Sequence, residues 1–140
     1  MKVKVIFQGR RRLHRDEKFL THGATVALAY TRDVVLYCGA TPVVFAHSVL
    51  APGDRGAGWR LMRGMGSRPL GAALFTDPRI RRLMLRQHKL ARGHELARHT
   101  FRTMNKKERF TPLWARRSLF IAGKSPILVT EVFLPEVLSL

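Results

Sequence analysis

Two charged side chains stand inside otherwise apolar stretches of this sequence, where they are the best candidates for chemistry. Glu131 is the only acid of the stretch 126–135, Pro-Ile-Leu-Val-Thr-Glu-Val-Phe-Leu-Pro. In a strand, alternation gives this stretch two apolar faces, so both faces should be covered. A buried, ionised carboxylate without a partner is strongly unfavourable, so Glu131 should have a partner or be protonated. It either forms a structural pair with an arginine or faces a ligand cavity.

Arg32 interrupts the apolar stretch 26–37 in the same way. Alternation places it on one face with Val34 and Cys38. A planar guanidinium in such a strand suits a carboxylate, which it can bind through two parallel hydrogen bonds. That carboxylate could come from Glu131 or from the neighbourhood of Asp33, which would be structural, or from a substrate. The residue types alone leave both interpretations open.

Two further features could serve a ligand. Arg116 and Arg117 are adjacent on a predicted strand and must point to opposite faces, so at most one can enter a shared cavity. The segment Gly66-Ser-Arg-Pro-Leu-Gly71 joins two predicted helical pieces. Its glycines permit close approach of the backbone to a ligand, and N–H groups near a helix start suit an anion. By itself a turn of this kind is most often only a connector.

Several other classes of site are not indicated. The six histidines (14, 22, 47, 88, 94 and 99) show no metal-ligand spacing, and His94 and His99 are expected in solvent. There is no nucleophile elbow, P-loop or dinucleotide fingerprint. Cys38, the lone cysteine, is interpreted as a small core residue and excludes an internal disulfide framework. The sequence predicts neither a metal ion nor an organic cofactor.

The charge of the chain is unusual, with 26 Lys and Arg against 9 Asp and Glu, a net charge of +17 over 140 residues. Such a field attracts small anions and polyanions alike. The basic residues are spread from Arg10 to Arg117, with no recognition helix or stacking motif, so nucleic acid is not the expected partner. No apolar run has the length of a bilayer span, and the first residues lack the features of a signal peptide. The expected location is the cytoplasm.

The predicted elements form one domain, residues 1–140, of the α+β class. Short helical pieces are predicted over residues 59–65, 69–75 and 78–86, a strand is favoured over residues 87–102, and a loop tip over 105–109. Strands first, helices in the middle and strands last indicate an antiparallel sheet. The clearest strands are residues 2–8, 25–38, 43–50, 113–122 and 126–134.

Three motifs, in order along the chain, resemble the chorismate–pyruvate lyase family. The last is Leu-Trp-Ala-Arg-Arg-Ser-Leu-Phe (113–120) followed by the Thr-Glu-Val-Phe-Leu-Pro stretch that ends at Pro135. The middle one, Gly-Ser-Arg-Pro-Leu-Gly-Ala-Ala-Leu-Phe (66–75), is similar to a ligand-covering flap. The first is the strand pair formed by residues 30–37 and 42–49. The resemblance implies a sheet of about six antiparallel strands, with short helices and flaps covering an internal ligand cavity.

The resemblance also implies an activity and a set of site residues. The family splits chorismate into 4-hydroxybenzoate and pyruvate without a cofactor, a step that feeds ubiquinone biosynthesis. By the match of motifs, Arg32 binds the ring carboxylate, Glu131 lies near the 4-hydroxyl and Leu70 contacts ligand through its backbone. Arg32 and Glu131 are thus the expected catalytic pair, and Arg117 or Arg116 is expected to help with the second carboxylate. The enzyme is expected to be a monomer.

The family pattern also contains a helical segment, with a second flap, before the first strand. Here Met1 lies almost at that strand, so the sequence is expected to lack this segment. The main alternative function is a non-catalytic, aromatic-acid-binding effector domain, as in GntR-type regulators, which share the fold. A basic nucleic-acid-binding protein is a third possibility. Release of pyruvate from chorismate separates the enzyme from both.

Overall fold

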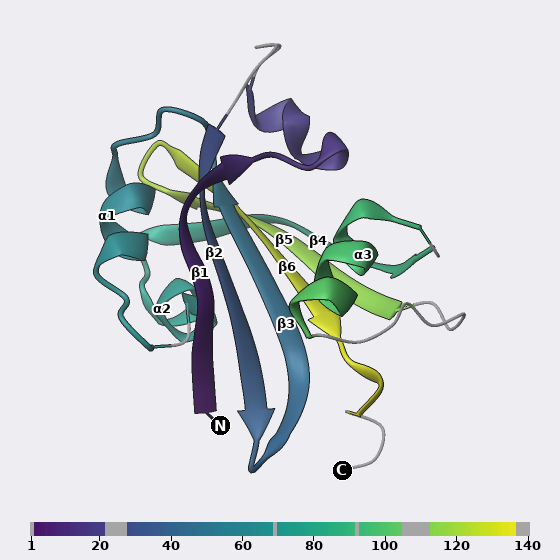
Figure 1. Cartoon of the computed structure of the whole chain (residues 1–140). Helices are drawn as coiled ribbons and strands as arrows, with labels where there is room; N and C mark the ends of the chain where they lie inside the picture. The colour runs from purple at the N-terminus through teal and green to yellow at the C-terminus, as the bar shows by residue number, and fades with distance from the viewer. Residues whose placement is uncertain (1, 22–27, 69, 92, 105–112, 137–140) are drawn as a thin grey trace.

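Six antiparallel strands form one sheet in the order β1-β2-β3-β6-β5-β4 (Figure 1). The computed structural model describes residues 2–21, 28–68, 70–91, 93–104 and 113–136. Around the sheet lie a 3-10 helix, η1 (Arg15–Thr21), and the helices α1 (Ala57–Arg63), α2 (Leu70–Thr76) and α3 (Glu95–Thr103). The predicted α+β class is confirmed. The strands are β1 (Lys2–Arg12), β2 (Leu28–Cys38), β3 (Thr41–Leu50), β4 (Ile80–Leu90), β5 (Leu113–Ala122) and β6 (Ser125–Phe133).

The strand register divides the side chains of the central strands between two faces. Arg32 of β2 lies opposite Ser48 of β3, and Ser48 lies opposite Val129 of β6. Because side chains alternate along a strand, this row points to one face, which we call the cavity face. The neighbouring row points to the other face, which we call the α3 face, and consists of Asp33, His47 and Thr130.

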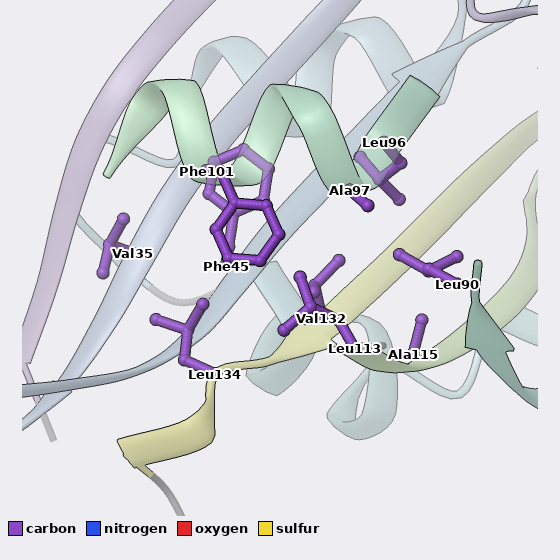
Figure 2. Close-up of a cluster of buried hydrophobic side chains, with 10 residues drawn as sticks. All are labelled: Val35, Phe45, Leu90, Leu96, Ala97, Phe101, Leu113, Ala115, Val132 and Leu134. Carbon is purple, nitrogen blue, oxygen red and sulfur yellow. The ribbon is translucent and has the colours of Figure 1, made fainter. Parts of the chain in front are cut away.

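Each face carries its own core. On the cavity face, α1 and α2 pack through Met62, Leu70 and Leu74 against Phe120 and Val129 of the sheet. On the α3 face, η1 covers one end of the sheet and α3 covers the other (Figure 1). Figure 2 shows the core beneath α3, where the buried side chains are Val35, Phe45, Leu90, Leu96, Ala97, Phe101, Leu113, Ala115, Val132 and Leu134.

Two glycine turns fix this arrangement. Gly39 joins β2 to β3 with a φ of 62°, and Gly123 joins β5 to β6 with a φ of 63°. Two-residue hairpin turns need a residue with a positive φ, a backbone conformation that residues other than glycine adopt only at a cost in free energy. The Gly39 turn holds the register of β2 against β3, and the pairing of β3 with β6 then places Arg32 and Glu131 on one face.

Two predicted elements are wrong. Residues 78–86 were expected to be helical, but most of them belong to β4, an edge strand with Arg81, Arg82 and Leu83 exposed. Most side chains of this edge strand are exposed, and a bulge between Arg82 and Met84 breaks the alternation, so the strand pattern is missing. The second error is the strand favoured over residues 87–102, whose second half is α3. The buried Leu96, Ala97, Thr100 and Phe101 do recur at helical spacing, but the expected strand ran together the end of β4 and this helix.

The start of the predicted strand 25–38, residues 69 and 92, and the whole predicted loop tip at 105–109 lie outside the described residues. Within the described ranges, no helix has the length and apolar character needed to cross a membrane.

Candidate functional site

A cavity of about 260 Å³ lies on the cavity face, between the sheet and α2. An apolar cavity of about 150 Å³ is large enough to bind benzene, so this one has room for a single ring with substituents. Its polar side chains, which can orient such a ligand, are Arg32, Ser48 and Glu131. The remaining lining consists of Val34, Leu36, Ala46, Leu70, Gly71, Leu74, Phe120 and Val129.

Arg32 is almost completely buried, with 1% of its surface exposed. Its Nη1 donates to Gln8 Oε1 at 2.7 Å and to the carbonyl of Gly66 at 2.9 Å. Its Nη2 donates to the carbonyl of Arg68 at 2.8 Å. Burial lowers the pKa of Arg32 and nearby Tyr30 opposes this, but a guanidinium keeps its proton in proteins. The cation is therefore held by three neutral acceptors and by no carboxylate of the described residues.

The hydrogen-bond donors of Arg32 are not all used. A guanidinium has five N–H groups, and the contacts above use both on Nη1 and one on Nη2. The N–H on Nε is buried and has no acceptor among the described residues. Nε and Nη2 together form the edge that binds a carboxylate through two parallel hydrogen bonds. An unsatisfied buried donor is costly, so this edge is suited to a ligand carboxylate.

Gln8 positions Arg32 and was missed in the sequence. It lies on β1 opposite Arg32, and its Nε2 donates to Tyr30 Oη at 3.0 Å and to the carbonyl of Met62 at 2.9 Å. These bonds turn its Oε1 toward the guanidinium. Val5 is on the cavity face, and simple alternation would put Gln8, three residues later, on the α3 face. A bulge between Val5 and Phe7 shifts the register, so that Gln8 also lies on the cavity face. No signal in the sequence marks this bulge.

Glu131 is the more exposed of the two charged side chains that line the cavity, and it is paired with Arg116. Arg116 is its cross-strand neighbour on β5, and its Nε and Nη2 donate to Glu131 Oε1 at 2.9 Å and 2.8 Å. The side chains of Arg116 and Glu131 are 32% and 24% exposed. Arg32 and Glu131 are not bonded to each other. They come from strands on either side of β3, and strand spacing puts their Cα atoms roughly 12 Å apart.

Leu70 and Arg117 were also predicted to bind substrate, and the structure separates them. Leu70 begins α2 and lines the cavity, where it was expected. Arg117 points to the α3 face, so its predicted place in the cavity is wrong. There its Nε donates to Thr130 Oγ1 at 3.1 Å and its Nη2 lies 3.2 Å from Asp16 Oδ2. Of the two adjacent arginines, Arg116 is the one on the cavity side.

The histidines and the cysteine also differ from expectation. His99 is buried, with 5% exposed, and it meets His14 and His47 on the α3 face together with Glu17 and Asp33. Sequence spacing gave no sign of this cluster because its members come from four separate elements. Cys38, expected in the core, is exposed at the end of β2, beside the Gly39 turn.

Two triads of this cluster are close enough to share one metal ion: His14 with Glu17 and His47, and Asp33 with His47 and His99. The distances favour protons instead. His47 Nδ1 is 2.6 Å from Asp33 Oδ1, and His47 Nε2 is 2.7 Å from Glu17 Oε2. Ligand atoms about 2.0 Å from a tetrahedral zinc ion lie roughly 3.3 Å apart, so these short contacts are hydrogen bonds.

Comparison with solved structures relates the fold to bacterial regulators. The C-terminal domain of the histidine utilization repressor from Pseudomonas syringae pv. tomato gives a TM-score of 0.63, covering 97% of this chain and 92% of that one. The two sequences are 11% identical, so this likeness concerns the fold alone.

Comparison of sequences is more specific. Residues 1–139 match the family model described as Chorismate lyase. A protein of Nitrosospira multiformis named "Probable chorismate pyruvate-lyase" is 46% identical over 140 residues, which cover 99% of this chain and 76% of that protein. A protein of the same name from Azoarcus sp. is 43% identical over 140 residues, covering 99% of this chain and 74% of that protein. The chain therefore belongs to the chorismate lyase family.

Proposed function

We propose that this protein cleaves chorismate to 4-hydroxybenzoate and pyruvate in the cavity between the sheet and α2. The observation that carries the proposal is the unused Nε of Arg32, beside an Nη2 with one N–H still to use, buried at one end of a cavity sized for one ring. That edge fits the ring carboxylate shared by chorismate and 4-hydroxybenzoate. Glu131, at the other end, is then near the carbon that bears the hydroxyl group.

The reaction needs positioning and one proton transfer. The ether bond between the ring carbon and the enolpyruvyl oxygen breaks, and the neighbouring ring carbon, which carries the hydroxyl group, loses its hydrogen as a proton. The ring becomes aromatic, and the released enolpyruvyl group takes up one proton on its methylene carbon to become pyruvate. No oxidant or reductant enters this balance. Arg32 fixes the ring, while Glu131 takes up the proton or delivers it to the ether oxygen.

Other residues have supporting roles in this proposal. Arg116 holds Glu131 and is the cation on the cavity side that can meet the second carboxylate of chorismate. The backbone of Leu70 closes over the ring from α2. Family membership supports a product that enters ubiquinone biosynthesis. Action as a monomer, a cytoplasmic location and the absence of a nucleic-acid partner remain predictions.

A coupled pyruvate assay with chorismate tests the proposal on wild type, Arg32→Ala and Glu131→Gln. Loss of the charged hydrogen bonds of Arg32 should lower kcat/KM by roughly 10- to 100-fold. Loss of the Glu131 carboxylate should lower kcat by about 10²- to 10⁴-fold. Arg81→Ala, which removes an exposed arginine of β4, is the matched control and should keep the wild-type rate.

The results separate the alternatives. An unchanged rate in Arg32→Ala or Glu131→Gln removes that residue from the mechanism. A wild-type protein that binds 4-hydroxybenzoate but releases no pyruvate would instead support a binding domain without catalysis.

A further inference from the structure

A buried network of ionisable groups lies directly behind the cavity, on the α3 face of the same strands. At its centre is His47 of β3, 2% exposed, between Asp33 of β2 and Glu17 of η1, both fully buried. Around them lie Arg11 of β1, His14 next to η1, and His99 of α3. None of these residues lines the cavity, so the proposed reaction does not use them directly.

The hydrogen bonds define the charge of His47. Each of its ring nitrogens faces a carboxylate, Asp33 at 2.6 Å and Glu17 at 2.7 Å. Ionised carboxylates only accept hydrogen bonds, so both ring nitrogens must donate and the ring is an imidazolium. Burial alone would lower the pKa of His47, but its bonds to Asp33 and Glu17, and the charges of those groups, raise it to about 10.

The remaining groups complete the balance of charge. Arg11 Nη1 donates to Asp33 Oδ2 at 3.0 Å, so two cations face two carboxylates. His99 Nε2 is 3.0 Å from Asp33 Oδ2 and 3.1 Å from Arg11 Nη1. His14 stacks on His47 with ring centroids 4.9 Å apart, and its Nε2 is 3.2 Å from His99 Nδ1. Burial lowers the pKa of His14; the charge of Glu17 opposes this and that of His47 adds to it, and the net lowering favours a neutral ring.

The network and the cavity share their backbone. Asp33 directly follows Arg32, and His47 stands between Ala46 and Ser48, which both line the cavity. Side chains that alternate on one strand share a backbone, so a backbone shift at Asp33 or His47 also moves the neighbouring cavity residues. A displacement of about 1 Å can cost 100-fold in rate.

We infer that His47 is a positioning residue for the cavity: its imidazolium, held between Asp33 and Glu17, fixes β2 against β3 and so sets the guanidinium of Arg32 where a carboxylate can bind. This inference rests on the proposed function, because it assigns His47 a part in the same site. It acts through Arg32 and not on the substrate.

The test compares His47→Gln with His47→Arg, and uses His88→Gln as a matched control for a histidine of β4 outside the network. The readouts are the Kd of 4-hydroxybenzoate, kcat and KM for chorismate, and the ¹⁵N–¹H NMR signals of the His47 ring. In wild type at pH 7 both ring nitrogens should carry a proton. His47→Gln should raise Kd and KM by roughly 10- to 100-fold with a smaller change in kcat.

His47→Arg should recover most of the affinity, because it keeps a cation that can donate to both carboxylates. A merely structural role would lower the melting temperature of His47→Gln without changing the Kd of the folded protein. If His47→Gln does not fold, Glu17→Gln, which leaves the Asp33 contact in place, should raise Kd in the same direction by a smaller factor.

Three results would overturn the inference: a folded His47→Gln with wild-type Kd, an unprotonated nitrogen on His47 at pH 7, or a stoichiometric metal ion in the purified protein that is lost in His47→Gln. Failure of the proposed function would give a different set of results from failure of this inference. In that case wild type releases no pyruvate, while the NMR signals of His47 and the dependence of 4-hydroxybenzoate binding on His47 remain as expected.

Discussion

Arg32 combines two demands that usually conflict, because it must be held firmly and still keep donors for a ligand. Three neutral acceptors, on Gln8, Gly66 and Arg68, hold the guanidinium without neutralising its charge. A carboxylate partner in their place would compete with the substrate for the same cation. The use of carbonyl and amide oxygens therefore leaves both the charge and the Nε edge for binding.

The identity of this cation should matter even when its charge is kept. In Arg32→Lys, the ammonium group has three N–H donors, and the three protein acceptors can use them all. We expect the Kd of 4-hydroxybenzoate, measured by calorimetric titration, to rise by roughly 10- to 100-fold. Arg81→Lys on exposed β4 is the control. A Kd within about twofold of wild type in Arg32→Lys would show that the side-on edge is not used.

The sequence predicts some of these residues and not others, for a physical reason. Arg32 and Glu131 are visible because a charge inside an apolar strand is costly, and strand alternation then gives their common face. Gln8 is hidden by a bulge that changes its face. His47 is hidden because its partners, Glu17 and Asp33, lie on other elements, and their distances depend on the folded chain.

At the scale of elements, the connector between α1 and α2 is part of the anion site. Gly66 has a φ of 59°, and its carbonyl accepts from Arg32. Arg68 stabilises the same turn, since its Nε donates to the carbonyl of Met65 and its Nη2 to that of Gly64. The positive φ of Gly66 is thus the conformation that presents two carbonyls to the buried cation.

A side chain at this position should disturb both the turn and the site. Gly66→Ala forces alanine into the left-handed region, which should destabilise the fold by about 1 kcal/mol or more. Because the carbonyl of residue 66 moves, affinity for 4-hydroxybenzoate should fall as well. Gly64→Ala, where φ is −85°, is the control and should change both much less. Thermal unfolding and ligand titration measure the two effects, and equal behaviour of the two variants would contradict the prediction.

Element prediction from sequence succeeds where one side of an element is buried in apolar core. β2, β3 and β6 fit this condition and were predicted, as were α1 and α2. β4 does not meet this condition, because the strand lies at the edge of the sheet and its Leu83 and Leu85 are exposed between arginines. α3 meets the condition, since Leu96, Ala97 and Phe101 face the core, but the predicted strand joined it to the end of β4 and so obscured its start.

For the molecule as a whole, the buried network should make stability depend on pH from both sides. Burial alone would raise the pKa of Glu17, but the bond to His47 and its charge outweigh burial and lower the pKa from 4.5 to about 2. The stabilisation from Glu17 is therefore complete above pH 4.5 and is lost as the pH falls toward 2. The lowered pKa of His14 adds to the loss on the acid side, below pH 6.5.

His47 is responsible for the expected loss of stability at alkaline pH. Its pKa is raised from 6.5 to about 10, so its stabilisation is complete below pH 6.5 and is lost as the pH rises toward 10. The free energy of unfolding, measured with urea, should fall by a few kcal/mol over this interval. His47→Arg should show a much smaller alkaline loss, because arginine does not titrate there. Equal pH profiles for the two proteins would show that His47 is not the group responsible.

The net charge of +17 should attract an anionic substrate from a distance and so raise its rate of association. We expect kcat/KM for chorismate, which has two carboxylates, to fall several-fold between about 20 mM and 200 mM salt, as the Debye length shortens. Affinity for 4-hydroxybenzoate, with one carboxylate, should fall less over the same range. Because kcat reports steps after binding, it should be nearly constant and serves as the internal control. A value of kcat/KM that does not change with salt would show that the net positive charge does not speed the binding of chorismate.

On the central strands, whether a residue number is even or odd decides which face of the sheet its side chain occupies. On β2 and β3 the even-numbered residues, among them Arg32 and Ser48, point into the cavity, and the odd-numbered Asp33 and His47 point away. One residue inserted between Asp33 and Gly39 would exchange the rows ahead of it, because the Gly39 turn holds the register of the neighbouring end of the strand. The cavity would then present an aspartate to an incoming carboxylate, and the ring-sized hollow would repel the anion that it now suits. The same insertion would separate Asp33 from His47, so loss of anion binding and loss of stability are expected together.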